Sequence, residues 1–149
     1  MMWVVGHADD YDQWADKHGA GEGWSWRALQ PHFHSLETYA DGPATRGRTG
    51  GISVTQVSQG APEHAAFIQA VHSTVNVPVR TDYNSGDNEG VALTQQSVTA
   101  DRERCDAFTA FVEPLGAHSN LTVVSEARVR RVVLRRDGAR HRGTWLCWS

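Results

Sequence analysis

Apolar residues recur at helical spacing near the start of the chain. Tyr11 and Trp14 are three positions apart within the otherwise polar segment 9–18, so one face of a helix would carry both rings. The glycine-rich stretch 19–23 follows at once, and glycine favours the end of a helix. The pattern therefore predicts a first helix over 9–18 that is closed by a turn.

A second helical segment follows this turn. Ser25 is a suitable N-cap, because its hydroxyl can accept a hydrogen bond from the backbone of the first helical turn. The pattern predicts that the helix extends from this cap to Tyr39. Pro31 lies within it, and an internal proline removes one helical hydrogen bond. We therefore expect two short helices that meet near Gln30.

The middle of the chain combines a loop with strands. Segment 41–51 holds five glycine or proline residues among eleven, which predicts a surface loop. Ile52 and Val54 then alternate with polar residues in segment 52–57, which indicates a strand. Segment 91–99 has the composition of a further strand.

Two more helices are expected, and a proline marks each of them. One begins at Pro62, because proline is tolerated in the first turn of a helix. The other covers 103–112 and is closed by Pro114. An apolar stripe predicts one buried face on the first of these helices. That stripe consists of Phe67, Ala70, Val71 and Thr74.

The last third of the chain predicts a pair of strands. Segments 121–124 and 129–134 are rich in valine and leucine, and residues 125–127 would join them. With a further loop expected over 78–88, the elements are short and the loops are long. The predicted fold class is α/β, in the sense of a mixed α+β chain. Loops of this length usually carry function or belong to a larger structure.

Charge and composition exclude several classes of function. The formal net charge is −3, whereas a nucleic-acid-binding protein usually has an excess of lysine and arginine. The arginine-rich segment 128–142 is interpreted as solvated side chains along one strand and its turn. No run of 18 apolar residues occurs, so no membrane span is expected. We therefore expect neither a nucleic-acid partner nor a membrane span.

Cysteine usage indicates the redox environment. Cys105 and Cys147 are the only cysteines, too few for a disulfide framework or a Cys-x-x-Cys metal site. Segment 1–5 is apolar but has no charged region before it, so it is not interpreted as a signal peptide. We expect a reduced, cytoplasmic setting. The sequence leaves the oligomeric state open.

Nucleotide- and calcium-binding patterns are incomplete. Segment 19–21 reads Gly-Ala-Gly, but a helix is expected before it, and Trp24 stands where a dinucleotide-binding loop has its last glycine. Segment 82–86 resembles the start of a calcium loop, but Leu93 occupies the position of the closing glutamate. A helix-ending turn and a polar turn explain these two segments better.

Metal-binding and hydrolytic patterns are incomplete as well. His32 and His34 are two positions apart in an expected helix, so their side chains point to different sides. The acidic residues of segment 9–12 are explained by the helix dipole. No Gly-x-Ser-x-Gly sequence is present. The residues alone therefore predict no metal site and no catalytic residue.

Segment 3–14 resembles a known family. It reads Trp-Val-Val-Gly-His-Ala-Asp-Asp-Tyr-Asp-Gln-Trp and is similar to the stretch that follows the flavin-contacting Asn-x-Met loop of glucose–methanol–choline (GMC) oxidoreductases. Trp3, Gly6 and Asp12 fit the aromatic, small and acidic positions of that signature. Segment 23–33 resembles the family's Gly-Trp and following helix, and segment 50–54 its Gly-Pro-Leu-x-Val strand.

Further blocks keep the family's order. They are residues 82–84, 89–91, 104–107, 111–114, 120–124 and 127–129. We assign residues 1–136 to a partial N-terminal region of the family and residues 137–149 to a tail that does not match and is not expected to continue a strand. An altered reading frame or an arbitrary end would explain this tail. Val5 departs from the family, which has arginine there, and Cys105 and Asp106 replace a small Ser-Ala pair.

The resemblance implies a function. It identifies the chain as an internal fragment, cut at both ends, of an FAD-dependent oxidoreductase that acts on the CH–OH group of a small alcohol. The pattern is most similar to choline-dehydrogenase-like members, so the substrate would be choline-like or another primary alcohol. The fragment would span part of an FAD-binding doubly wound domain and part of an antiparallel-sheet substrate domain. A non-catalytic structural remnant without cofactor is the alternative.

The resemblance also implies which residues approach the cofactor. Met1 and Met2 fall on the loop that passes the flavin, and Val129 matches a strand position whose backbone meets the adenine. Val129 is equally well interpreted as plain core. The family's glycine-rich pyrophosphate loop would precede Met1, and its catalytic histidine would follow Ser149. We therefore expect no catalytic residue here, and we expect that this chain alone neither holds FAD tightly nor oxidises alcohols.

Overall fold

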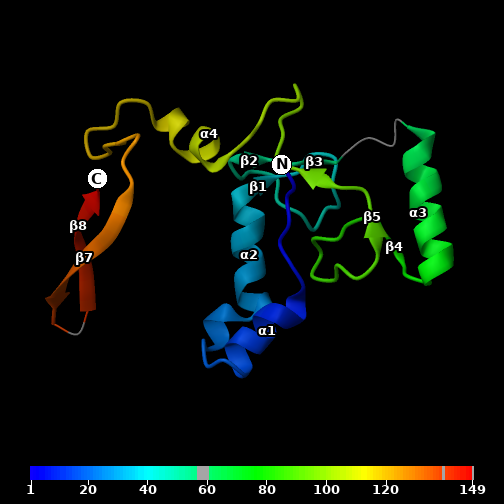
Figure 1. Ribbon diagram of the computed structural model, residues 1–149, viewed down its shortest axis with the longest axis horizontal. Coiled ribbons are helices and arrows are strands. Elements are labelled where there is room, and N and C mark those ends of the chain that lie inside the picture. Colours follow the sequence, from blue (N-terminus) through cyan, green and yellow to red (C-terminus); the bar gives the residue numbers. More distant parts are fainter. Residues whose placement is uncertain (57–60, 139, 149) are drawn as a thin grey trace. The chain divides into compact units, whose positions relative to one another are not determined.

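The computed structural model describes residues 1–56, 61–138 and 140–148 (Figure 1). The chain divides into two units, Met1–Pro114 and Leu115–Ser149, and each is described by itself. Short helices and strands of both kinds are present. The predicted mixed α and β fold class is therefore confirmed.

The first two helices are α1 (Ala8–Asp16) and α2 (Trp26–Leu36), with a 3-10 turn (Glu22–Trp24) between them. The predicted N-cap of α2 is confirmed, since Ser25 Oγ accepts a hydrogen bond from Ala28 N at 3.3 Å. Asp12 of α1 adds a second contact, because its Oδ1 accepts from Trp26 N at 2.8 Å. A side chain from the middle of α1 thus helps to fix the start of α2.

The predicted break at Pro31 is wrong, since α2 continues through it. Aromatic packing on both sides of the proline offsets the lost hydrogen bond. Trp26 precedes Pro31 and Phe33 follows it, and their rings lie 5.7 and 5.5 Å from the ring of Tyr11. The helix also ends at Leu36 rather than at Tyr39, because the next two residues enter a strand.

Three pairs of two-residue strands follow. β1 (Glu37–Thr38) pairs with β2 (Ile52–Ser53) in parallel, and β3 (Thr55–Gln56) pairs with β6 (Gln95–Gln96) antiparallel. β4 (Val79–Arg80) pairs with β5 (Val91–Ala92) in parallel. The predicted strands 52–57 and 91–99 are therefore each divided in two, and the expected loop 78–88 contains β4. Val57 lies outside the described residues.

Helix α3 (Pro62–Val75) begins at the predicted proline but buries a different face. Its half-buried residues include Ile68, Val71 and His72, whereas Phe67 is 67% exposed. Figure 1 shows that α3 runs beside the short β4–β5 pair, and α3 contacts β5. Strands of two residues can cover only a small part of a helix of this length. The predicted stripe is wrong apart from Val71, since spacing alone does not say how wide the covering surface is.

Helix α4 (Ala107–Phe111) is shorter than the predicted 103–112. Its N-cap is Asp106, whose Oδ1 accepts a hydrogen bond from Thr109 N at 3.0 Å. The residues before it form a tight turn instead, in which Thr99 N donates to Glu103 O at 2.9 Å. This turn brings Val98 and Arg104 together as a β-bridge.

The core of the first unit is more polar than apolar. Its buried hydrophobic residues are Ala15, Tyr39, Ile52, Val54 and Cys105. Its buried polar or charged residues are Ser25, Glu37, Arg46, Asp82, Asn84, Gln95 and Ser97. Many large apolar side chains of the same unit are exposed instead, among them Met2, Val4 and Trp24. Hydrogen bonds and ion pairs therefore hold much of this unit together.

The second unit is a β-hairpin of β7 (Val129–Asp137) and β8 (Arg140–Trp148). Gly138 in its turn has φ 60°, a conformation that glycine adopts without strain. The predicted strand 121–124 does not form, and β8 forms in the segment where no strand was expected. Within the described part of the chain, no helix is both long and apolar enough to span a bilayer.

A backbone feature of the 99–103 turn is testable. Arg102 has φ 65°, which costs a non-glycine residue about 1–2 kcal/mol. We expect Arg102→Gly to leave the free energy of unfolding unchanged or to raise it by up to about 1 kcal/mol, because glycine's greater freedom in the unfolded chain offsets part of the gain. Urea denaturation followed by circular dichroism measures this. The matched control, Arg104→Gly, should lose about 0.5–1 kcal/mol; equal losses in both variants would contradict the prediction.

Candidate functional site

The two methionines at the start of the chain lie along strand β6. Ser97 N donates to Met1 O at 3.2 Å, Trp3 N donates to Gln95 O at 2.8 Å, and Met2 forms an antiparallel bridge with Gln96. The N-terminal segment thus extends the β3–β6 pair by one short strand. We call residues 1–3 together with β6 and β3 the N-terminal patch.

The outer face of the N-terminal patch carries Met2. Gln96 pairs with both Met2 and Thr55, and directly opposed residues in antiparallel strands point to the same face. Met1 and Met2 are 41% and 62% exposed. Both predicted cofactor-contacting residues are therefore accessible. The Met2 side chain lies on the sheet face that also carries Thr55 and Gln96.

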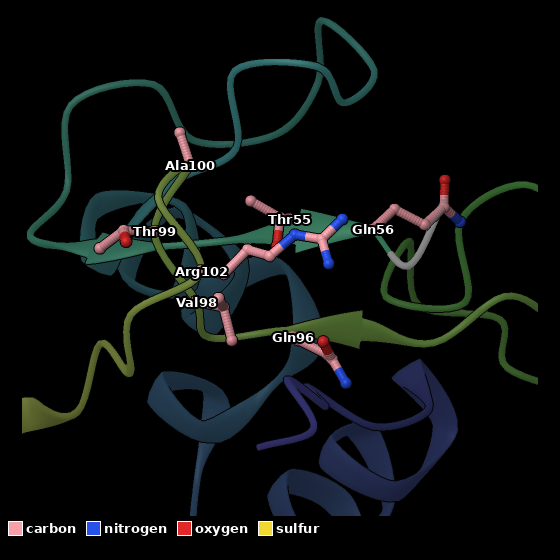
Figure 2. A pocket seen from close by; sticks show the side chains of 7 residues that line it. All are labelled: Thr55, Gln56, Gln96, Val98, Thr99, Ala100 and Arg102. Carbon is pink, nitrogen blue, oxygen red and sulfur yellow. The ribbon is translucent and has the colours of Figure 1, made fainter. Parts of the chain in front are cut away.

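A cavity of about 350 Å³ opens at the N-terminal patch. Figure 2 shows its lining side chains, which come from β3, from β6 and from the turn that follows β6. The lining residues are Thr55, Gln56, Gln96, Val98, Thr99, Ala100 and Arg102. Most of these side chains are polar, so the cavity is suited to a ligand that forms hydrogen bonds.

The inner face of the N-terminal patch rests on a buried arginine network, which consists of Arg46, Glu37, Asp82, Asn84 and Gln95. Arg46 donates to Glu37 Oε1 at 2.7 Å and to Glu37 Oε2 at 2.5 Å. It also donates from Nη1 to Asp82 Oδ1 at 2.7 Å and to Gln95 Oε1 at 3.0 Å. The side chains of Arg46, Glu37 and Asp82 are only 2%, 1% and 7% exposed.

The buried arginine network also holds the start of the chain. Trp3 Nε1 donates to Glu37 Oε2 at 2.8 Å, and Asn84 Nδ2 donates to Trp3 O at 2.9 Å. Asn84 Oδ1 then accepts from Val5 N at 2.7 Å. No buried side-chain nitrogen or oxygen among the described residues lacks a partner. The position of the methionines is thus set by a fully paired polar cluster.

Sequence reasoning missed this network. Arg46 lies in the predicted surface loop 41–51 but is only 4% exposed, so that part of the prediction is wrong. The loop approaches the end of α2 closely at Gly47, where a Cβ atom would lie 2.0 Å from His34 O. Glu37 was expected within a helix. A glycine beside an arginine was the only signal, and it is too common to identify a buried ion pair.

Electrostatics keep Arg46 charged. Burial lowers the pKa of Arg46, but the hydrogen bond and charge of Glu37, together with Asp82, outweigh it and raise the pKa above its ordinary value. A guanidinium that stays charged balances carboxylates that would be costly to bury alone. The network therefore has a structural role and offers no group for proton transfer.

Other sequence candidates are also placed. Segment 82–86 is a turn, as predicted, but Asp82 and Asn84 face the arginine network. His32 and His34 lie on α2. In the part of the chain that the structure describes, no three histidine, cysteine or acidic residues form a group suited to a metal ion. Val129 begins β7 in the second unit, 52% exposed and opposite Trp148; its adenine contact stays a prediction.

Comparisons with known proteins give this geometry a context. A family model described as GMC oxidoreductase matches residues 1–145. The oxygen-dependent choline dehydrogenase of Brucella anthropi is 30% identical over 135 residues, which cover 90% of this chain and 24% of that protein. Human mitochondrial choline dehydrogenase is 29% identical over 89% of this chain and 22% of its own length. The chain thus spans about a quarter of the length of these relatives.

Solved structures agree on the fold. Pyridoxine 4-oxidase from Mesorbium loti matches 95% of this chain and 28% of its own, with a TM-score of 0.77 and 28% identity. An FAD-dependent oxidoreductase from Chaetomium thermophilum matches 91% of this chain and 25% of its own, with a TM-score of 0.78. Its identity of 23% supports the fold alone.

The buried arginine network predicts a large loss of stability on one substitution. Arg46→Met would leave two buried carboxylates without their cation, and breaking a buried ion pair costs about 3–5 kcal/mol. Urea denaturation should show that loss in the free energy of unfolding, or show that the variant does not fold. Arg27→Met is the matched control, since the side chain of Arg27 is 89% exposed and pairs only with Glu22 among the described residues. Similar stabilities for the two variants would contradict the structural role of Arg46.

The three tyrosines predict a loss of stability in alkali. Burial is the main cause that raises the pKa of Tyr11, Tyr39 and Tyr83 above 10.0. A raised folded-state pKa gives stabilisation that is complete below the unfolded value and lost as pH rises through the folded value. Ultraviolet titration should therefore show tyrosinate formation above pH 10 in the folded chain and near pH 10 in urea. Tyr39→Phe should reduce the loss of stability at alkaline pH. If the tyrosines titrated at the same pH in the folded and the urea-unfolded chain, burial would not raise their pKa and the prediction would be contradicted.

Proposed function

Because the chain belongs to the GMC oxidoreductase family, we propose that it is part of an FAD-dependent oxidoreductase acting on the CH–OH group of a small alcohol. The observation that carries this proposal is the placement of Met1 and Met2. Both lie on an accessible sheet edge, and the sequence resemblance assigns them to the loop that passes the flavin in this family. The two choline dehydrogenases among the relatives support a choline-like or other primary alcohol as the substrate class.

The residues of this chain fit one part of FAD and not another. An exposed methionine on a rigid sheet edge is suited to contact a flat, largely apolar ring system. A pyrophosphate would need a glycine-rich turn between a strand and a helix. The turn of residues 19–23 follows α1 instead, and a Cβ atom added to any of its three glycines would meet no other part of the described chain within 4 Å.

These observations divide the roles within the proposed enzyme. FAD would accept the hydride that leaves the alcohol carbon. Met1 and Met2 would contact the flavin, and Val129 would meet the adenine through its backbone. The arginine network would hold the methionine edge in place. We propose no catalytic residue in this chain and no tight FAD binding by the chain alone.

Several assignments from the sequence stay predictions at this stage. They include the division at residue 136, the cytoplasmic location and the absence of a nucleic-acid partner. A structural remnant that binds no cofactor also remains the second candidate. The polar core and exposed apolar residues of the first unit favour this candidate only if no partner surface covers them.

A chimera separates the two candidates. Residues 1–136 would replace the aligned segment of the Brucella anthropi choline dehydrogenase. If the segment is functional, the chimera should purify with bound flavin, seen as a yellow absorbance band, and oxidise an alcohol. A remnant would give a colourless, inactive protein. The control carries the same junctions with the relative's own segment.

The 149-residue chain by itself gives the complementary test. After incubation with FAD and gel filtration, it should elute without flavin, because the described residues offer no pyrophosphate-binding turn. Retention of one FAD per chain would overturn the view that this chain supplies only part of the cofactor site.

A further inference from the structure

The cavity at the N-terminal patch brings together three polar side chains from separate segments. Thr55 comes from β3, Gln96 from β6 and Arg102 from the 99–103 turn. Figure 2 shows the Arg102 side chain extending from its turn along β3 toward Gln56. Because Thr55 and Gln96 are paired residues, the two side chains stand on one face of the sheet beside Arg102.

These three side chains have free hydrogen-bonding capacity. Within the described residues, none of the three side chains forms a hydrogen bond or ion pair with another residue. Two of the other loop arginines of the first unit differ, whereas Arg104 likewise forms no side-chain hydrogen bond or ion pair within the described residues but does not line the cavity. Arg46 is paired with carboxylates, and Arg48 donates to four backbone carbonyls. An arginine that has no partner in the described part of the chain and is directed along a cavity wall is available to a ligand.

The charge around the cavity favours an anion. No aspartate or glutamate is among the described residues that line it. Asp101 and Glu103 flank Arg102 in the sequence and all three residues are exposed, but neither acidic residue lines the cavity. Arg102 also keeps a left-handed backbone, with φ 65°, at an energetic cost. Strained residues are concentrated at ligand-binding sites, and this one directs the guanidinium along the cavity.

We propose that this cavity binds the carboxylate of a small hydroxy acid and that Arg102 is its anchor. The planar guanidinium matches a carboxylate with two parallel hydrogen bonds, and the amide of Gln96 and the hydroxyl of Thr55 add donors. A quaternary ammonium such as choline would meet a like charge here. Aromatic rings and carboxylates, which bind such cations, are both absent from the lining.

This inference rests on the proposed function, because it names the class of alcohol that the oxidoreductase would take. The cavity and Met2 share one sheet face. A hydroxy acid anchored by its carboxylate would therefore keep its alcohol end on the face where the flavin contact is proposed. The substrate would then be an acid rather than choline, the alcohol for which the choline dehydrogenase relatives are named.

The test is a flavin-free binding measurement on the 149-residue chain. Sodium glycolate, the simplest hydroxy acid, is titrated into ¹⁵N-labelled protein at constant ionic strength, and amide resonances are followed by NMR. Ethylene glycol and choline chloride are titrated in parallel as a neutral and a cationic alcohol. We expect saturable shifts at Thr55, Gln96 and Arg102 with glycolate alone.

Two variants make the result specific. Arg102→Gly removes the guanidinium from a position where glycine suits the backbone, so it should fold and bind glycolate roughly tenfold more weakly or worse. Arg104→Gln is the matched control, because Arg104 does not line the cavity, and it should bind as the parent does. Unchanged binding in Arg102→Gly, no glycolate shifts, or equal shifts with choline would each overturn the proposal.

The outcome is distinguishable from failure of the proposed function. If the chain binds glycolate through Arg102 but the chimera holds no flavin, the carboxylate site stands and its role in alcohol oxidation falls. If the chimera oxidises choline and the chain shows no glycolate shifts, the oxidoreductase assignment stands and the hydroxy-acid inference falls.

Discussion

The charge balance between Arg46 and its two carboxylate partners is the interaction on which the first unit depends. Glu37 follows the last turn of α2, Asp82 follows β4, and Arg46 lies in the loop between β1 and β2. A single guanidinium therefore joins the residue after α2 to the residue after β4, which lies 36 positions beyond Arg46. In a low-dielectric interior such a cluster is stable only when every member is paired. This requirement restricts the path of the backbone more than apolar packing would, because a hydrogen bond forms only over a small range of distances and angles.

A polar interior has a consequence for the surface. Among the described residues of the first unit, five hydrophobic residues are buried, whereas Met2, Val4, Trp24 and other large apolar side chains remain exposed. Exposed apolar groups of this kind often mark surfaces that another protein segment or a ligand covers. This distribution suits a chain that matches about a quarter of the length of its choline dehydrogenase relatives.

The sequence predicted local structure better than long-range structure. The cap at Ser25 and the start of α3 at Pro62 follow from short-range chemistry, and both are confirmed. The continuity of α2 through Pro31 depends on a ring from another helix, and the β7–β8 pairing depends on the turn at Gly138. The buried arginine was not predictable, since loop composition does not reveal which polar group turns inward. Resemblance predicted that Met1 and Met2 approach the flavin, but strand register was needed to see that Met2 shares a sheet face with the cavity.

The hydrogen bonds of Asn84 have an implication for biosynthesis. This side chain joins the backbone at Trp3 and Val5, across about eighty positions of sequence. Residues 1–3 leave the ribosome about ninety residues before their partners on β6, which emerge only after residue 95 has been added. During translation this segment must therefore wait, without these partners, for most of the first unit to appear. Such distant closure slows folding and lengthens the time in which nascent chains are open to chaperones.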